Sequence, residues 1–300
     1  MKIAITGAFS YSGKYIARRL LARGEEIVTL TGHTRRDDPF EGRIRAFPLD
    51  FGDTAALAES LAGVRVLVNT YWIRFDRGQN TQARAVQNTR LLVRLAREVG
   101  VQRLVHVSIT NPSPASSLQY FAGKAAIEEI IEESGISYAI LRPTVIFGAE
   151  DILVNNMAYL LRRFPFFLIP GDGQCRLQPI FVEDLAELAV EAVYRTDDYR
   201  IDAVGPEVFS FRQLVDLLST EIGRHRLLIL VPPRVALWAA QLLSIVLGDV
   251  LLTPQEITGL LANLLISEDP PRGNTRLSHW LRDNRASIGL HYASELRRHY

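Results

Sequence analysis

Short apolar runs alternate, regularly as far as about Gly148 and once more between residues 183 and 204, with longer segments in which apolar residues recur every three or four positions. The runs are nearly continuous in Val, Ile and Leu, which is typical of parallel strands covered on both faces. They predict strands at Lys2–Thr6, Glu26–Thr31, Ile44–Leu49, Val64–Asn69, Arg103–Ser108, Ser137–Leu141 and Arg200–Val204. The periodic segments predict helices at Gly13–Arg23, Thr54–Leu61, Thr81–Val99, Leu118–Glu133 and Glu183–Tyr194. Asp53 is suited to cap the second helix. This order predicts a doubly wound parallel α/β sheet.

The alternation stops near Gly148, and residues 150–176 and the chain after Gly205 read as irregular or helical. We therefore expect a core domain over residues 1–205, with part of a smaller lobe inserted at about 149–178, and a mainly helical C-terminal lobe over 206–300. Such a lobe would lie over the carboxyl ends of the strands, where ligands bind in open α/β sheets.

One stretch of the expected lobe, Val235 to Gly248, carries only Gln241 and Ser244 as polar side chains. It is shorter than the roughly 20 residues that span a bilayer. A helix that is apolar nearly all round is usually buried, so we expect a core helix. A surface that faces a protein partner or a membrane is the alternative.

Composition removes several classes of function. The chain has 300 residues, 48% of them hydrophobic, and a formal net charge of +1 with both signs interspersed, which does not fit a nucleic-acid binder. The single cysteine, Cys175, excludes an internal disulfide, and the six histidines show no metal-binding spacing, so no metal is expected. Because the chain runs straight into a strand, we expect no signal peptide and a cytoplasmic location.

The turn after the first strand has glycines at both ends. Gly7 lies at the tight turn and Gly13 near the start of the next helix, an arrangement that brings backbone amides and a helix N-terminus against a pyrophosphate. Ser10 occupies the middle position, where the usual dinucleotide pattern has glycine. The alternative is that the glycines serve only the turn.

The end of the second strand bears on the choice of cofactor. An acidic residue there would bind the adenosine ribose of NAD, but no acid precedes Asp37. Arg35 and Arg36 can instead pair with the 2′-phosphate of NADP. We expect NADP as the cofactor, with NAD as the alternative. The alternative for Arg35 and Arg36 is that they are solvated charges of a loop.

Tyr120 and Lys124 lie four residues apart on a predicted helix, twelve residues after Ser108. Residues with this spacing share a helix face, so the ammonium can act on the phenol and lower its pKa from about 10. A tyrosine in this setting can exchange a proton with a hydroxyl or carbonyl near neutral pH. A half-buried tyrosine beside a solvated lysine is the alternative.

Taken together, these motifs resemble the extended and atypical short-chain dehydrogenase/reductase superfamily, which includes epimerase/dehydratase-like proteins, NmrA-like proteins and the nucleotide-binding accessory subunit of respiratory complex I. The matching residues are Thr6–Gly13, Leu49–Asp50, Asn69–Thr70, Ser108, Tyr120 with Lys124, Leu141–Pro143, Gln178–Asp184 and Tyr292–Leu296.

The resemblance implies a Rossmann-type fold and a role for each matching residue. The residues expected at the cofactor are Gly7, Phe9, Ser10, Tyr11, Gly13, Arg35, Arg36, Asp50, Asn69, Thr70, Lys124, Pro143 and Thr144. Of these, Asp50 would touch the adenine and Lys124 the nicotinamide ribose. Tyr120 would be the acid/base, with Ser108 orienting the reacting oxygen. Tyr71 and Trp72 would wall the substrate site, or pack beneath the lobe.

The family's asparagine aligns with Ala85, a departure that weakens the expected proton relay. His106 reads as a core histidine and Glu128, Glu129, Glu132 and Glu133 as a solvated helix face. The expected function is an oxidoreductase or epimerase that acts on a small carbonyl or alcohol. The alternative is an NAD(P)-binding accessory or sensor protein with a vestigial site.

Overall fold

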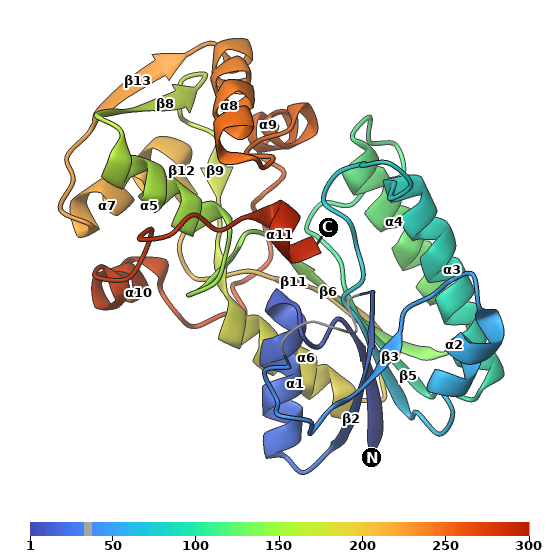
Figure 1. Ribbon diagram of the computed structural model, residues 1–300. Coiled ribbons are helices and arrows are strands. Elements are labelled where there is room, and N and C mark those ends of the chain that lie inside the picture. Colours follow the sequence, from blue (N-terminus) through green and yellow to red (C-terminus); the bar gives the residue numbers. More distant parts are fainter. Residues whose placement is uncertain (33–37, 300) are drawn as a thin grey trace. The chain divides into compact units, whose positions relative to one another are not determined.

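The computed structural model describes residues 1–32 and 38–299 (Figure 1). The chain forms two compact units, residues 1–143 with 182–202, and residues 144–181 with 203–300. Each unit is built from two separate segments of the chain.

Within the described residues, seven strands of the first unit and its border form one sheet in the order β11-β6-β5-β4-β1-β2-β3. The strands are β1 Lys2–Thr6, β2 Glu26–Thr31, β3 Arg45–Pro48, β4 Val66–Asn69, β5 Arg103–Val107, β6 Ser137–Pro143 and β11 Tyr199–Ala203. The pairs from β3 through β6 are parallel. The predicted strands and the predicted fold class are thus confirmed, with ends that agree to within two residues. Strand order reverses between β1 and β4, the point where such sheets bind ligands.

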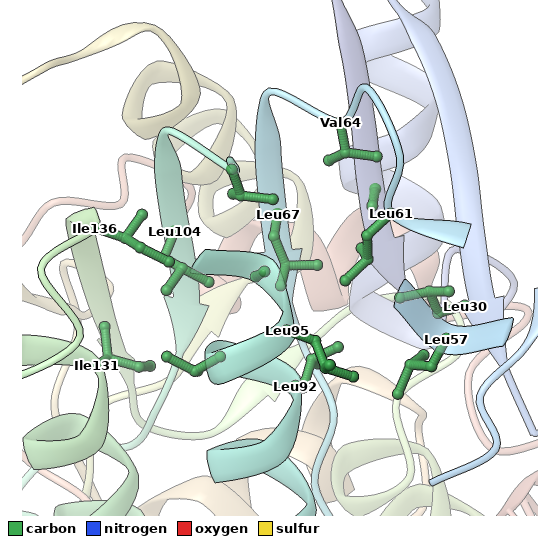
Figure 2. Close-up of a cluster of buried hydrophobic side chains, with 14 of the residues drawn as sticks. Leu30, Leu57, Leu61, Val64, Leu67, Leu92, Leu95, Leu104, Ile131 and Ile136 are labelled. Atoms are coloured by element: carbon green, nitrogen blue, oxygen red, sulfur yellow. The ribbon is translucent and has the colours of Figure 1, made fainter. Parts of the chain in front are cut away.

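Helices cover both faces of this sheet (Figure 1). Helices α1 (Tyr11–Ala22) and α6 (Val182–Tyr194) pack together on one face, and α2 (Thr54–Ser60), α3 (Gln82–Glu98) and α4 (Gln119–Glu132) lie on the other. Asp53 accepts a hydrogen bond from the Ala56 amide at 3.0 Å, which confirms the predicted cap. Figure 2 shows the core beneath α2–α4, where Leu67 and Leu104 of the sheet meet Leu92 and Ile131 of the helices. This core fixes the carboxyl ends of the strands.

The second unit contains short two-stranded pairings and several helices. The strands are β7 Ile146–Phe147 with β10 Ile180–Phe181, β8 Phe166–Pro170 with β13 Leu227–Val231, and β9 Arg176–Leu177 with β12 Phe209–Ser210. The helices are α5 Leu153–Arg163, α7 Phe211–Glu221, α8 Pro233–Leu247, α9 Pro254–Leu261, α10 Leu277–Asn284 and α11 Glu295–His299. The sequence pattern predicted none of these strands, and the two-residue ones such as β7 and β9 are too short to carry a period.

Helix α8 is the apolar stretch that we expected to be buried, and that expectation is wrong. Only Ala236 and Ala240 are buried, whereas Trp238, Ile245 and Val246 are 63%, 79% and 81% exposed. One apolar face of α8 packs on the protein and a second apolar face points outward. Such a helix has the same composition as a fully buried one, so the sequence does not distinguish these two cases. No helix in residues 1–32 and 38–299 is both long and apolar enough to cross a membrane.

Candidate cofactor and active site

The turn between β1 and α1 requires glycine at two positions. Gly7 has φ +75°, in the left-handed region that favours glycine, and its carbonyl accepts the Ser10 amide at 2.8 Å. A Cβ on Gly13 would stand 2.2 Å from the Gly7 carbonyl oxygen. The loop between β1 and α1 therefore contacts the first turn of α1 backbone to backbone. Because no side chain stands between them, an anion can approach the helix N-terminus.

That N-terminus fits a phosphate group. Ser10 occupies the N-cap position without a side-chain cap hydrogen bond, and the first turn of α1 holds no acidic residue. The amides of the first helical turn and the positive end of the helix dipole favour negative charge here. Of the neighbouring aromatic residues expected at the cofactor, Phe9 packs near Phe40, and the Tyr11 ring meets the Tyr15 ring edge-on.

The ends of β1, β4 and β5 are tied together by buried polar side chains. The Thr6 hydroxyl donates to Asn69 Oδ1 at 3.1 Å and accepts the Thr70 amide at 2.8 Å, while Thr70 Oγ1 donates to the Thr6 carbonyl. Asn69 Nδ2 lies 3.2 Å from Nδ1 of His106. The structure thus places Asn69 inside the protein, in contact with these strands.

Of the remaining expected cofactor residues after β2 and β3, the structure describes Asp50. Asp50 is exposed after β3, and its carboxylate accepts the Gly52 amide at 2.8 Å. Arg35 and Arg36 lie outside the described residues. Asp38, the first described acid after β2, accepts the amides of Phe40 and Gly42, so its carboxylate is engaged in its own turn.

Ser108 is buried just past β5, where its amide donates to the Leu141 carbonyl at 2.7 Å. Its hydroxyl donates to Glu128 Oε1 at 2.5 Å, and the same oxygen accepts Arg142 Nε at 3.0 Å. The prediction that Glu128 lies on a solvated helix face is wrong. The buried face of α4 extends one turn beyond Lys124, and Arg142 of β6 supplies the charge that makes a buried carboxylate tolerable there.

Lys124 is a buried ammonium, 3% exposed. Its Nζ donates to the Val107 carbonyl at 3.0 Å and lies 4.9 Å from the centre of the Trp72 ring. Burial lowers the pKa of Lys124 to about 7, although the negative charge of Glu128 acts in the opposite direction. Lys124 can therefore exchange a proton near neutral pH.

Trp72 packs on α4 between the expected catalytic residues. Its ring meets the Tyr120 ring edge-on with centroids 5.5 Å apart, and a Cβ on Gly123 would stand 2.8 Å from Cη2 of the indole. Tyr71 points to α3, where its hydroxyl accepts Asn88 Nδ2 at 3.0 Å, and burial raises the pKa of this phenol. Asn88 and Glu128 were missed as site neighbours from the sequence. Glu128 follows Lys124 by four residues, and this spacing was the signal that could have placed it on the same helix face.

His106 is buried in β5, as expected of a core histidine. Its Nδ1 lies 3.1 Å from the Asn69 carbonyl, but its Nε2 has no hydrogen-bond partner among the described residues. Burial first, and then the charge of Lys124, hold the pKa of His106 well below its usual value. The imidazole is therefore neutral at neutral pH.

The last two expected cofactor residues lie where the first unit ends. The Pro143 carbonyl accepts the Thr110 amide at 3.0 Å. Thr144 begins the next stretch of chain, in the second unit, and its hydroxyl donates to the Gln178 carbonyl. In the first unit Trp72 is thus a neighbour of both Tyr120 and Lys124, and Lys124 bonds the carbonyl of Val107, the residue before Ser108.

Known proteins match this chain in sequence. The NAD(P)H-binding family matches residues 7–154. Subunit 9 of the NADH dehydrogenase [ubiquinone] 1 alpha subcomplex of Arabidopsis thaliana, a mitochondrial protein, is 23% identical over 227 residues, which are 71% of this chain and 56% of the relative. An uncharacterized protein of Mycobacterium tuberculosis is 24% identical over 222 residues, and the match covers 23% of its length. The chain thus spans less than two thirds of these relatives.

Solved structures share the fold along nearly the whole chain. An NADPH-dependent quinone oxidoreductase of Escherichia coli, solved with NADPH, has a TM-score of 0.74 at 20% identity and covers 95% of this chain and 98% of its own. A nucleoside-diphosphate-sugar epimerase of Staphylococcus aureus has a TM-score of 0.74 at 19% identity and covers 94% and 100%. At these identities the likeness concerns the fold.

Proposed function

We propose that this chain, which matches the NAD(P)H-binding family over residues 7–154, is an NADP-dependent oxidoreductase or epimerase of the extended short-chain dehydrogenase/reductase type that acts on a small carbonyl or alcohol. The observation that carries the proposal is the common surrounding of Tyr120, Lys124 and Ser108. One indole, Trp72, contacts both Tyr120 and Lys124. The carbonyl that Lys124 binds belongs to Val107, the residue before Ser108.

The glycine turn suits the cofactor's pyrophosphate, since Gly7, Gly13 and the uncapped start of α1 present amides without a side chain in the way. When bound, the nicotinamide supplies or accepts the hydride. In reduction, Tyr120 donates its phenolic proton to the substrate oxygen, and the ammonium of Lys124 stabilises the phenolate that remains. Ser108 holds the substrate oxygen through a hydrogen bond.

NADP is the proposed cofactor because no acidic residue stands between the end of β2 and Asp37, whereas Arg35 and Arg36 do. The first described acid there, Asp38, is held by its own turn. Replacing both Arg35 and Arg36 by alanine should weaken NADPH at least about tenfold and leave NADH unchanged, since a charge-assisted phosphate contact is worth about 1.5–3 kcal/mol. Titration of both nucleotides measures this, and tighter NADH than NADPH binding in the parent protein would overturn the choice.

A second function, nucleotide binding without catalysis in an accessory or sensor protein, is favoured by one observation. The Ser108 hydroxyl is bonded to Glu128, and the Lys124 ammonium to Val107. Both groups would have to leave or share these partners to act on substrate and cofactor. A mitochondrial relative named as a subunit of NADH dehydrogenase is consistent with this reading.

Turnover separates the two functions, because both bind the cofactor. The parent protein should oxidise NADPH with a member of a panel of quinones, aldehydes, ketones and nucleotide sugars. Tyr120→Phe should bind NADPH normally and lose about 10²–10⁴-fold in rate. Tyr138→Phe is the matched control, since Tyr138 pairs with Leu104 near the opposite, amino end of the sheet. Parental turnover by Tyr120→Phe would refute the assigned role. Tight NADPH binding with no turnover of the panel would favour the second function.

A further inference from the structure

The buried face of α4 is attached to the end of β5 by two side chains that lie one helical turn apart. Lys124 Nζ donates to the Val107 carbonyl at 3.0 Å. The hydroxyl of the next residue, Ser108, donates to Glu128 Oε1 at 2.5 Å. Residues four apart on a helix lie on one face, with their Cβ atoms about 5–6 Å apart. The Glu128 carboxylate and the Lys124 ammonium are therefore neighbours at this strand end, and each residue is 3% exposed.

The Glu128 carboxylate is held in this place from β6 as well. Arg142 Nε lies 3.0 Å from Oε1 and 3.2 Å from Oε2, and Arg142 Nη2 lies 2.5 Å from Oε2. A guanidinium that binds both carboxylate oxygens fixes the geometry of the pair as well as its charge. Strands β5 and β6 pair as far as Val107 and Leu141. Ser108 and Arg142 therefore bind the carboxylate from two neighbouring strand ends.

These contacts decide which hydrogen bonds the site still offers. A carboxylate accepts hydrogen bonds, so the single proton of the Ser108 hydroxyl is committed to Glu128 and the lone pairs of this hydroxyl remain for a further partner. An ammonium has three donors, and Val107 binds one of those of Lys124. Ser108 can thus accept from a bound ligand, and Lys124 can donate to one, while both keep the contacts that hold them.

The charged and titratable groups around Lys124 come from α4, β5 and β6. The Lys124 charge acts on His106 of β5, but burial first and then this charge hold the pKa of His106 well below its usual value, so the imidazole is neutral. Tyr120 precedes Lys124 by one turn of α4, and Arg142 of β6 lies behind Glu128. The buried positions of α3, which packs on α4, carry no charged side chain. Glu128 is the carboxylate of this set.

We infer that Glu128 is a positioning residue of the site, which keeps Lys124 in its ammonium form and fixes the Ser108 hydroxyl. The inference rests on the proposed function, in which the ammonium stabilises the phenolate of Tyr120. Burial lowers the pKa of Lys124 to about 7, and the charge of Glu128 acts against this fall. Without the carboxylate a larger share of Lys124 is neutral at pH 7, and a neutral amine stabilises a phenolate less. Arg142 has the opposite effect on Lys124, because it neutralises part of the carboxylate charge.

The test is an NMR titration of the cofactor-free protein with isotope-labelled lysine. The chain has three lysines, Lys2, Lys14 and Lys124, so the Lys124 signal is readily assigned by its loss in Lys124→Met. Glu128→Gln keeps the shape of the side chain and should lower the pKa of Lys124 by about 1 or more, since an opposite charge within about 4–6 Å favours the charged form to that extent. Arg142→Gln should raise it, because the carboxylate then acts on Lys124 without a competing cation.

Glu129→Gln is the matched control, because Glu129 is the exposed neighbour on the same helix, and it should leave the pKa of Lys124 unchanged. A general loosening of the fold would admit water to Lys124 and raise its pKa in every variant, so opposite shifts separate the effect of charge from a loss of packing. Glu128→Gln/Arg142→Met removes both charges, a change that buried pairs often tolerate. It should lower the pKa of Lys124 as Glu128→Gln does.

An unchanged or raised pKa of Lys124 in both Glu128→Gln and the double variant would overturn the inference. The titration uses neither cofactor nor substrate, so this result is distinct from an absence of turnover, which counts against the proposed function. With a substrate from the panel, the loss of turnover at high pH should move to lower pH in Glu128→Gln by the same amount as the pKa of Lys124. A loss that stays at the parental pH would also contradict the positioning role.

Discussion

Replacing Lys124 by methionine tests the buried ammonium through stability alone, before any substrate is known. The side chain is 3% exposed, and burial lowers its pKa from the ordinary 10.5 to about 7. Such a difference means that charging Lys124 costs roughly 5 kcal/mol more in the folded chain than in the unfolded chain. Methionine keeps the length of the side chain and removes this cost, but it leaves the Val107 carbonyl without its donor, at about 1–3 kcal/mol.

The sign with pH follows from proton binding. Between the folded pKa of about 7 and the unfolded value of 10.5, the unfolded chain binds more protons at Lys124, so this residue makes the free energy of unfolding rise with pH. Below about 7 the full cost of the charge is present. Lys124→Met should therefore be more stable than the parent by about 2–4 kcal/mol near pH 6, and this advantage should vanish toward about pH 10.

Urea unfolding of the cofactor-free protein across this range measures the difference. Lys2→Met is the matched control, because Lys2 also donates to a backbone carbonyl, that of Ala62 at 2.7 Å, but at the surface. It should show neither the gain in stability nor its pH dependence. The reasoning fails if Lys124→Met is less stable than the parent near pH 6, or if the difference between them does not change with pH.

Three further substitutions test two buried carboxylates, Asp151 and Glu128, and one closely packed glycine, Gly123. Asp151 is buried, and burial raises its pKa to about 6. As pH falls from about 6 to 4, the free energy of unfolding of the parent should therefore rise by about 3 kcal/mol relative to that of Asp151→Asn, as measured by urea unfolding. Glu128→Gln leaves a guanidinium without its counter-charge and should cost about 3–5 kcal/mol, whereas exposed Glu129→Gln should cost nothing measurable; equal effects would contradict the buried pair. Gly123→Ala should cost about 1–3 kcal/mol by overpacking, and a double-mutant cycle with Trp72→Leu should recover most of it.

The sheet was predictable because its strands are buried on both faces. In β1, β4 and β5 every residue but Lys2 is buried and most are apolar, so the runs and their order were readable from Lys2 to Ala203. The glycine turn was readable as well, since Gly7 and Gly13 are required by backbone geometry. In these segments local pattern and tertiary environment agree.

The surroundings of the site were not predictable, because they depend on partners distant in sequence. Glu128 reads as one of four glutamates on a helix, and only the arrival of Arg142 from β6 makes its burial possible. The same holds for α8, whose outward face is apolar without being covered. The sequence shows whether a helix face is polar or apolar. Whether that face is buried or exposed depends on the rest of the fold.

The buried charges beside Ser108 also bear on the proposed chemistry. Glu128 is matched by Arg142, and His106 is neutral because its pKa lies well below the usual value. Burial lowers the pKa of Lys124 to about 7, and the negative charge of Glu128, which is already paired with Arg142, offsets this only in part. In the proposed reaction a further negative charge arises on the phenolate of Tyr120, when that residue gives up its proton. The ammonium and the phenolate would then stabilise each other. The unfavourable free energy of burying the Lys124 charge is thereby offset at the step in which Tyr120 ionises.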